Sequence, residues 1–185
     1  PYTFSLDEER NEYTLTKYFG TEEEVVIPET INNIDVTSLG TSLFNDNKII
    51  TSVEIPKTIT SINENAFYYC SNLLYISVDE NNVIYDSRNN CNAVIKTSTN
   101  ELVVGTNTTV IPSDVVILGK YSFAGRNGLK EIQLPEGLTT IGTAAFRKCT
   151  SLESITIPST VTNIQGYAFD YCTCEIVWDN PTITT

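Results

Sequence analysis

The chain of 185 residues contains no histidine and no methionine. The absence of histidine excludes Ser-His-Asp triads, Cys-His dyads and zinc sites with imidazole ligands. The five cysteines are an odd number, so a framework that pairs all of them within the chain is excluded as well. Histidine-dependent enzymes and disulfide-rich small domains are therefore poor interpretations of this sequence.

Basic residues are also scarce, with 11 Lys and Arg against 23 Asp and Glu and a formal net charge of −12. A surface of this sign repels phosphate groups, so neither nucleic acid nor an anionic membrane is an expected partner. No stretch approaches the ~18 uncharged apolar residues of a membrane-spanning helix, so we expect no membrane insertion. The 41% of hydrophobic residues are enough to bury a continuous core, which argues against disorder.

What the sequence does contain is an internal repeat. A small or aliphatic residue followed by phenylalanine recurs with intervals of 23, 56, 23 and 23 residues between the phenylalanines. An apolar run closed by proline precedes each pair, and these prolines are spaced by 28, 56, 23 and 23 residues. The interval of 56 is one 23-residue unit plus 33 further residues, which locates one large insertion. The phenylalanines are Phe44, Phe67, Phe123, Phe146 and Phe169, and the prolines are Pro28, Pro56, Pro112, Pro135 and Pro158.

Each repeat unit predicts one short strand and one buried aromatic ring. In the clearest copy Ile155 and Ile157 point to the same side of a strand and Thr156 to the other, and Pro158 ends the pairing because it lacks an N–H. Stacked copies form a parallel sheet, and each phenylalanine contributes roughly 2–3 kcal/mol when fully buried. The predicted fold is a β-dominated solenoid of about six coils, with a parallel sheet on one face and short turns or 3-10 segments on the other.

The pattern Leu-x-x-Ile-x-Ile-Pro-x-x-Val-x-x-Ile-x-x-x-Ala-Phe-x-x-Cys resembles the BspA-like, or Treponema-type, leucine-rich repeats over residues 25–178. The opening residues 2–40 are similar to the family's N-terminal entry hairpin, and residues 82–97 resemble an insert of copies from gut Bacteroidetes. The resemblance implies a hairpin cap over residues 1–24 and a leucine-rich-repeat solenoid over residues 25–185. It also implies a secreted or surface-anchored protein that binds host matrix proteins or partner bacteria.

The insertion, at about residues 79–108, contains three short apolar runs separated by turns rich in Asn, Asp and Ser. The runs at 83–85, 93–95 and 102–104 predict a small antiparallel β-meander. We expect this meander to form a side flap that lengthens one coil, since its polar turns tolerate left-handed backbone geometry. A flap that contacts a ligand is the less favoured alternative.

Oxygen-bearing side chains gather where the insertion begins, and a calcium site is one interpretation of them. The segment lacks the glycine and the Asp-x-Asp-x-Asp rhythm of a dedicated calcium loop, so a solvated turn without metal is favoured. The residues are Asp79, Glu80, Asn81, Asn82 and Asp86.

One position of the repeat carries cysteine in three copies and a polar residue in two others: Cys70, Cys149, Cys172, Asn47 and Arg126. Because polar residues replace it, the cysteine is predicted to be buried structural filler that behaves as a small hydrophobic residue. Cys172-Thr173-Cys174 is too closely spaced for a CxxC redox motif, and no second pair completes a zinc ribbon. Disulfides between stacked cysteines are compatible with the pattern but not required by it.

The strand register predicts two rows of outward-facing side chains along the sheet. One row is Val26, Glu54, Ser77, Val110, Gln133 and Thr156, and the other is Ser52, Tyr75, Glu131 and Ser154. A partner would lie across these rows, and Tyr75 is the leading anchor because aromatic residues usually carry the largest share of binding energy. The candidate ligand-binding residues are Glu54, Tyr75, Ser77, Glu131, Gln133, Ser154 and Thr156. Simple solvation of these side chains is the alternative, and Tyr68, Tyr69 and Tyr171 are expected to pack on neighbouring coils.

These features favour a monomeric, surface-exposed protein-binding module for adhesion or host interaction, with no cofactor and no catalytic residues. The expected partner is a host extracellular-matrix or surface protein, or another bacterial surface protein, and the expected location is outside the cytoplasm. An enzyme is disfavoured because a solenoid presents a shallow sheet instead of a pocket. The alternatives are a structural spacer in a larger surface protein and a carbohydrate-binding module, the latter favoured if Tyr75 or Trp178 lies on an exposed platform.

Overall fold

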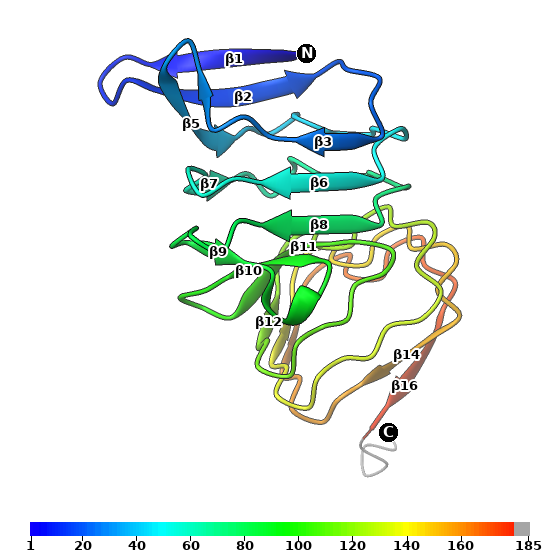
Figure 1. The fold of residues 1–185 in the computed structure, drawn as a ribbon. Helices are drawn as coiled ribbons and strands as arrows, with labels where there is room; N and C mark the ends of the chain where they lie inside the picture. Colours follow the sequence, from blue (N-terminus) through cyan, green and yellow to red (C-terminus); the bar gives the residue numbers. More distant parts are fainter. Residues whose placement is uncertain (180–185) are drawn as a thin grey trace.

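The computed structural model describes residues 1–179 and shows a solenoid of stacked β-coils (Figure 1). Within these residues the one helical segment is the 3-10 turn η1, Arg88–Asn90. No helix in the described part of the chain has the length and apolar character needed to cross a bilayer. The predicted β-dominated solenoid is thus confirmed.

The proline-closed runs of the first coils form one parallel sheet, here called the N-terminal sheet. Its strands are β3 (Glu24–Val26), β6 (Ser52–Ile55) and β8 (Tyr75–Val78), in that order. Because side chains alternate along a strand, Val25, Val53 and Ile76 stack in register and are buried. The predicted register is confirmed here, since Val26 lies beside Glu54 and Glu54 beside Ser77.

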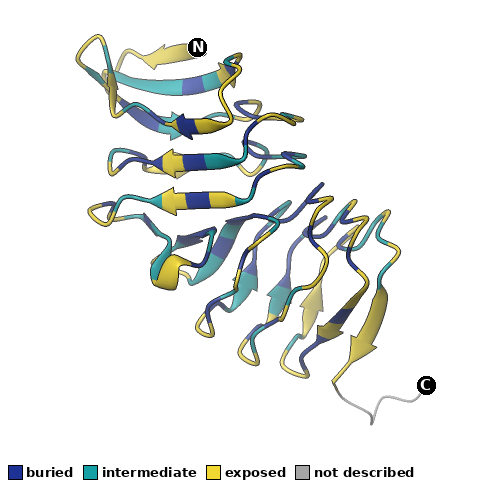
Figure 2. Cartoon of the chain, turned by 45° about the vertical axis from the view of Figure 1, so that its right-hand side comes forward, coloured by how far each residue is buried: buried dark blue, intermediate teal, exposed yellow. Residues whose placement is uncertain are grey.

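This sheet does not continue along the whole stack, so the prediction of uninterrupted rows is wrong beyond β8. β14 (Ser154–Ile157) and β16 (Glu175–Trp178) form a separate parallel pair, and the segments around Val110 and Gln133 are not strands. The insertion separates Val110 from β8, and the Val110 amide donates instead to the carbonyl of Cys91 at 3.0 Å. Figure 2 shows that the strands run in a different direction on the two sides of this break.

A second set of short strands lies in the other half of each coil, where the sequence predicts turns or 3-10 segments. They are β5 (Ile34–Leu39), β7 (Ser61–Ile62), β12 (Ile117–Leu118), β13 (Thr140–Ile141) and β15 (Asn163–Ile164). β5 pairs with β7 in parallel, and β12, β13 and β15 form a parallel series. Leu39, Leu118 and Ile141 point from these strands into the core.

An antiparallel hairpin of β1 (Tyr2–Asp7) and β2 (Glu12–Tyr18) opens the chain. At its turn the Asp7 carboxylate accepts hydrogen bonds from the amides of Glu9 and Arg10, both 3.1 Å. β2 pairs in parallel with β5, and β4 (Thr30–Ile31) pairs antiparallel with β5. The hairpin therefore extends the second set of strands and leaves β3 at the edge of the N-terminal sheet.

The insertion contributes β9 (Tyr85–Asp86), β10 (Ala93–Lys96) and β11 (Glu101–Gly105), which pair antiparallel. These strands are not a side flap, contrary to the expectation from the sequence. β11 pairs in parallel with β12, and Ala93, Ile95 and Leu102 are fully buried. The runs at 93–95 and 102–104 contribute to the core and β11 continues the stack to β12, whereas Val83 of the first run is 82% exposed.

The phenylalanines of the repeat form two columns of rings within the core. Phe44 and Phe67 have ring centroids 5.1 Å apart, and Phe146 lies 5.1 Å from Phe123 and 5.5 Å from Phe169. The Phe146 amide donates to the carbonyl of Ala168 in the next coil, and Phe44 and Phe123 make the equivalent 2.8 Å bond. Within each column neighbouring coils are thus joined by ring packing and a main-chain bond, and the two columns are separated where the insertion enters.

The cysteine position of the repeat lies beside these columns. The thiols of Cys70 and Cys149 each donate to the carbonyl of the phenylalanine in the preceding copy, Phe44 or Phe123, at 3.1 Å. Arg126 fills the same position at the junction of the two columns and is fully buried. The prediction of buried filler is confirmed for Cys70 and Cys149, whereas Cys172 is only half-buried.

Candidate binding surface

The outward side of the N-terminal sheet carries two short rows of side chains. Glu24, Ser52 and Tyr75 lie side by side in one row, and Val26, Glu54 and Ser77 in the other. Tyr75 is 55% exposed, and Glu54 and Ser77 are also exposed. The geometry brings together three of the candidate residues, Glu54, Tyr75 and Ser77, on one regular surface with an acidic and aromatic character.

The other four candidate residues lie elsewhere on the solenoid. Ser154 and Thr156 are exposed on β14, beside Glu175 and Val177 of β16. Glu131 and Gln133 are exposed on a segment without strand structure, which is joined to the next coil by a 3.3 Å bond from the amide of Glu153 to the carbonyl of Lys130. The seven residues therefore do not form one continuous surface, because the sheet that would align them is broken.

A further surface, not singled out by the sequence pattern, follows the turns around the phenylalanines. Tyr68 stacks on Tyr69 with ring centroids 4.0 Å apart and meets the edge of Tyr121 at 4.8 Å. The Lys148 ammonium lies 5.0 Å from the ring of Tyr69 and 5.5 Å from that of Tyr171. Tyr68 and Tyr69 thus pack against neighbouring coils. Tyr171 is instead 63% exposed and meets the cation of Lys148.

The backbone of these turns repeats as closely as the core does. The residue two positions after the repeat phenylalanine has a positive φ angle in every copy: Asp46, Tyr69, Gly125, Lys148 and Tyr171. A Cβ atom on Gly125 would overlap the ring of Tyr69, so glycine is needed where the two columns meet. The sequence offers only the constant distance of two residues from each repeat phenylalanine as a signal for this edge, because the left-handed backbone is visible only in the structure.

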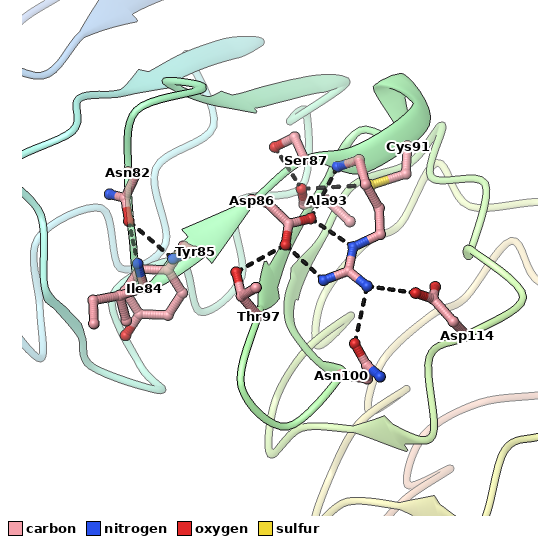
Figure 3. Close-up of polar contacts among 11 residues, drawn as sticks. Asn82, Ile84, Tyr85, Asp86, Ser87, Cys91, Ala93, Thr97, Asn100 and Asp114 are labelled. Carbon is pink, nitrogen blue, oxygen red and sulfur yellow. Dashed lines mark hydrogen bonds and ion pairs between the residues drawn. The ribbon is translucent and has the colours of Figure 1, made fainter.

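Two of the oxygen-bearing residues at the start of the insertion, Asn82 and Asp86, have their side-chain oxygens engaged in hydrogen bonds (Figure 3). The Asn82 side-chain oxygen accepts from the amides of Ile84 and Tyr85, both at 2.9 Å. Asp86 is paired with Arg88 at 2.6 Å and accepts a hydrogen bond from Thr97. Burial opposes ionisation of Asp86, but these bonds outweigh it and lower its pKa. The side chains of Asn82 and Asp86 therefore stabilise the turn and join it to the strands around it.

The cysteines have free thiols, and burial makes two of them unreactive. Burial raises the pKa of Cys70 to about 11 and that of Cys149 to about 12. Thiols with such pKa values are protonated at neutral pH and are poor nucleophiles and metal ligands. The Sγ atoms of Cys172 and Cys174 lie 3.1 Å apart in the last turn. Within residues 1–179 no group of three or more cysteine, aspartate or glutamate side chains is arranged to hold a metal ion.

Comparison with known proteins identifies the repeat. The model of the BspA type leucine rich repeat region matches the chain in six copies, over residues 23–99 and 103–177. No curated protein matches the sequence. The family match covers most of the chain, and it includes the strands on both sides of the sheet break.

Solved structures show the same fold. A leucine-rich repeat protein from Eubacterium ventriosum is 27% identical with a TM-score of 0.68, over 84% of this chain and 41% of that chain. A leucine rich cell surface protein from Faecalibacterium prausnitzii is 24% identical with a TM-score of 0.51, over 97% and 53%. The T. pallidum leucine rich repeat protein is 22% identical with a TM-score of 0.50, over 92% and 64%.

The chain spans between 41% and 64% of the length of these three proteins. The repeated strand-and-phenylalanine unit, its solenoid stacking and the six-copy match all agree. The protein therefore belongs to the family of BspA-type leucine-rich repeat proteins.

Proposed function

We propose that this protein is a non-catalytic protein-binding module exposed on a bacterial surface, and that the outward face of the N-terminal sheet contacts its partner. The observation that carries the proposal is the position of Tyr75, whose ring is 55% exposed on a regular strand. Leu73 and Ile76 beside it are buried, so the backbone under the ring is fixed. A tyrosine side chain has few rotatable bonds, so it loses little entropy on binding, and it is the kind of residue that dominates interface energies.

The charge of this face favours a partner with basic groups. Glu24 lies in the same row as Tyr75, with Ser52 between them, and Glu54 lies in the neighbouring row. The whole chain has a formal net charge of −12. Complementary charge speeds association and aligns the two surfaces. We propose a host extracellular-matrix or surface protein, or another bacterial surface protein, as the partner in adhesion. The description of the F. prausnitzii relative as a cell surface protein supports an extracellular location.

The proposal is tested by binding of the immobilised protein to a panel of matrix proteins and bacterial surface proteins. Tyr75→Ala should weaken binding by about 2 kcal/mol, or roughly thirtyfold, if Tyr75 is the anchor. Tyr167→Ala is the matched control, because Tyr167 is 71% exposed but lies outside the N-terminal sheet. If Tyr75→Ala and Tyr167→Ala change the affinity by the same amount, Tyr75 is not the anchor of the contact. If the protein binds nothing on the panel, a structural spacer is favoured.

A carbohydrate-binding module is the second candidate, because Trp178 is 58% exposed on β16 and Tyr75 is exposed as well. Exposed aromatic rings provide flat apolar faces on which sugar rings can stack. A glycan array with Trp178→Ala and Tyr75→Ala distinguishes the two functions. Sugar binding that either variant abolishes would support the carbohydrate-binding candidate over protein adhesion.

A further inference from the structure

A groove of about 460 Å³ lies between the N-terminal hairpin and β3, next to the face proposed above. Phe4 of β1 and Val26 of β3 contribute apolar groups to it and are 41% and 67% exposed. Filling the groove with a segment of chain would remove this apolar surface from water. The residues that line it are Pro1, Tyr2, Phe4, Tyr18, Glu22, Glu24, Val25, Val26, Pro28 and Ile31.

The groove exposes the unpaired edge of the N-terminal sheet. β3 is an edge strand because β2 of the hairpin pairs with β5 instead (Figure 1). Main-chain groups of successive residues in a strand point to opposite sides, and the Ile27 amide donates to Glu54 of β6 at 3.0 Å. The N–H and C=O groups of Glu24 and Val26 therefore point away from β6, toward the groove that both residues line. No strand of residues 1–179 pairs with them.

Acidic side chains stand around this edge. Glu22 and Glu24 line the groove, Glu23 lies between them in sequence, and all three are exposed. The Tyr18 hydroxyl donates to Glu22 at 2.6 Å, and this hydrogen bond lowers the pKa of the Glu22 carboxyl. The ionised carboxylates would repel each other if the β3 edges of two copies came together, which disfavours edge-to-edge dimers. They attract a segment that carries lysine or arginine.

We propose that the groove binds an extended peptide segment of a partner protein, which adds to β3 as a further strand and carries basic side chains among apolar ones. Main-chain hydrogen bonds with Glu24 and Val26 would hold the segment, as in other cases of strand addition. Glu24 and Val26 point to the same side of β3, so alternate side chains of the segment would lie beside both of them, and the remaining ones would face the other side of the strand. This site shares Glu24 and Val26 with the outward side of the sheet but does not include Tyr75, so it does not depend on a contact at Tyr75.

A capped, fluorescent heptapeptide of alternating lysine and valine tests the proposal with the whole protein. We expect saturable binding by fluorescence anisotropy, weakened about tenfold by Val26→Pro, because proline removes the N–H that faces the groove and spares the ladder to β6. Val26→Ala keeps that N–H and removes only part of the side-chain contact, so it is the matched comparison and should weaken binding less than Val26→Pro does. Glu24→Lys should weaken binding about tenfold and reduce its salt dependence.

Melting curves of the variants show whether each one is folded. If Val26→Pro is unfolded, the same test is made with a heptapeptide methylated at alternate backbone nitrogens, which should lose most of its affinity. Absence of saturable binding, or equal affinity for a glutamate-valine heptapeptide, would overturn the proposal. A dimer in analytical ultracentrifugation that the peptide does not disrupt would also overturn it. Tyr75→Ala should bind the heptapeptide as the unchanged protein does, so the two proposals can fail separately.

Discussion

Replacing Arg126 with methionine tests whether a buried guanidinium joins the two parts of the core. Arg126 lies between the phenylalanine columns, where other copies of the repeat have cysteine. Its Nε donates to the carbonyl of Gly105 at 2.7 Å. Its Nη1 donates to the carbonyls of Phe67, Cys70 and Ala124 at 3.1, 3.3 and 3.2 Å. The acceptors come from the insertion and from the coils on both sides of it.

Two opposing effects decide the sign of the change. Burial lowers the pKa of Arg126, because desolvation disfavours the charged guanidinium. Methionine would remove this desolvation cost. Methionine would also remove the hydrogen bonds of a charged donor, one from Nε and those of Nη1, whose hydrogens are shared among three carbonyls. A full bond of this kind is worth about 1.5–3 kcal/mol. The carbonyls of Phe67 and Cys70 also accept main-chain hydrogen bonds, from the amides of Cys70 and Leu73. They would therefore lose only part of their hydrogen bonding. We expect a net loss of about 2–4 kcal/mol in the free energy of unfolding, because the lost hydrogen bonds outweigh the relieved desolvation of one guanidinium.

Urea unfolding followed by two probes measures this loss. Trp178 is the single tryptophan and reports on the C-terminal coils through fluorescence, while far-UV circular dichroism reports on all strands. Arg126→Lys should be at least as destabilising as Arg126→Met, because lysine keeps the buried charge without the fork of donors. Arg10→Met, on the exposed hairpin turn, should change stability by less than about 0.5 kcal/mol. An Arg126→Met protein as stable as the unchanged protein would refute the reasoning.

Two further predictions concern the core on either side of this junction. Phe146→Ala should cost about 3–5 kcal/mol in urea unfolding, because the ring is fully buried between two others, whereas Phe4→Ala on the exposed hairpin should cost about 1 kcal/mol or less. Burial raises the pKa of Cys70 from 9.0 to about 11, so its thiol stabilises the fold fully below pH 9 and progressively less as the pH rises toward 11. Melting temperatures against pH should fall less steeply for Cys70→Ala, and equal slopes would contradict this.

The repeat interval made much of the fold predictable. Alternation around Val25, Val53 and Ile76 predicts the N-terminal sheet, because period-two patterns define which side of a strand is buried. The two-residue strands of the other half-coil could not be predicted, since a strand such as Thr140–Ile141 is too short to show a period. Their pairing depends on the stacking of whole coils.

The course of the insertion and the break in the sheet were also beyond the sequence pattern. The run at Leu102–Val104 predicts a strand but not its neighbour, and pairing of β11 with β12 depends on tertiary contacts. The same difficulty applies to Arg126, whose hydrogen bonds reach acceptors as far as 59 residues away in sequence. Polar filler was predictable at that position, but the carbonyl groups it would meet were not.

The features that define the fold and those that would define a binding partner occupy different positions of the same coil. Core positions repeat because each phenylalanine must pack on the next and bond to the following coil, as Phe146 does. Outward positions are free of that constraint, so Val26, Glu54 and Ser77 stand in one row with three different chemistries. A residue such as Tyr75 consequently carries no repeat signal, although the inward neighbours that fix it do. The repeat therefore predicts the scaffold, whereas the binding specificity of the protein must be measured one outward residue at a time.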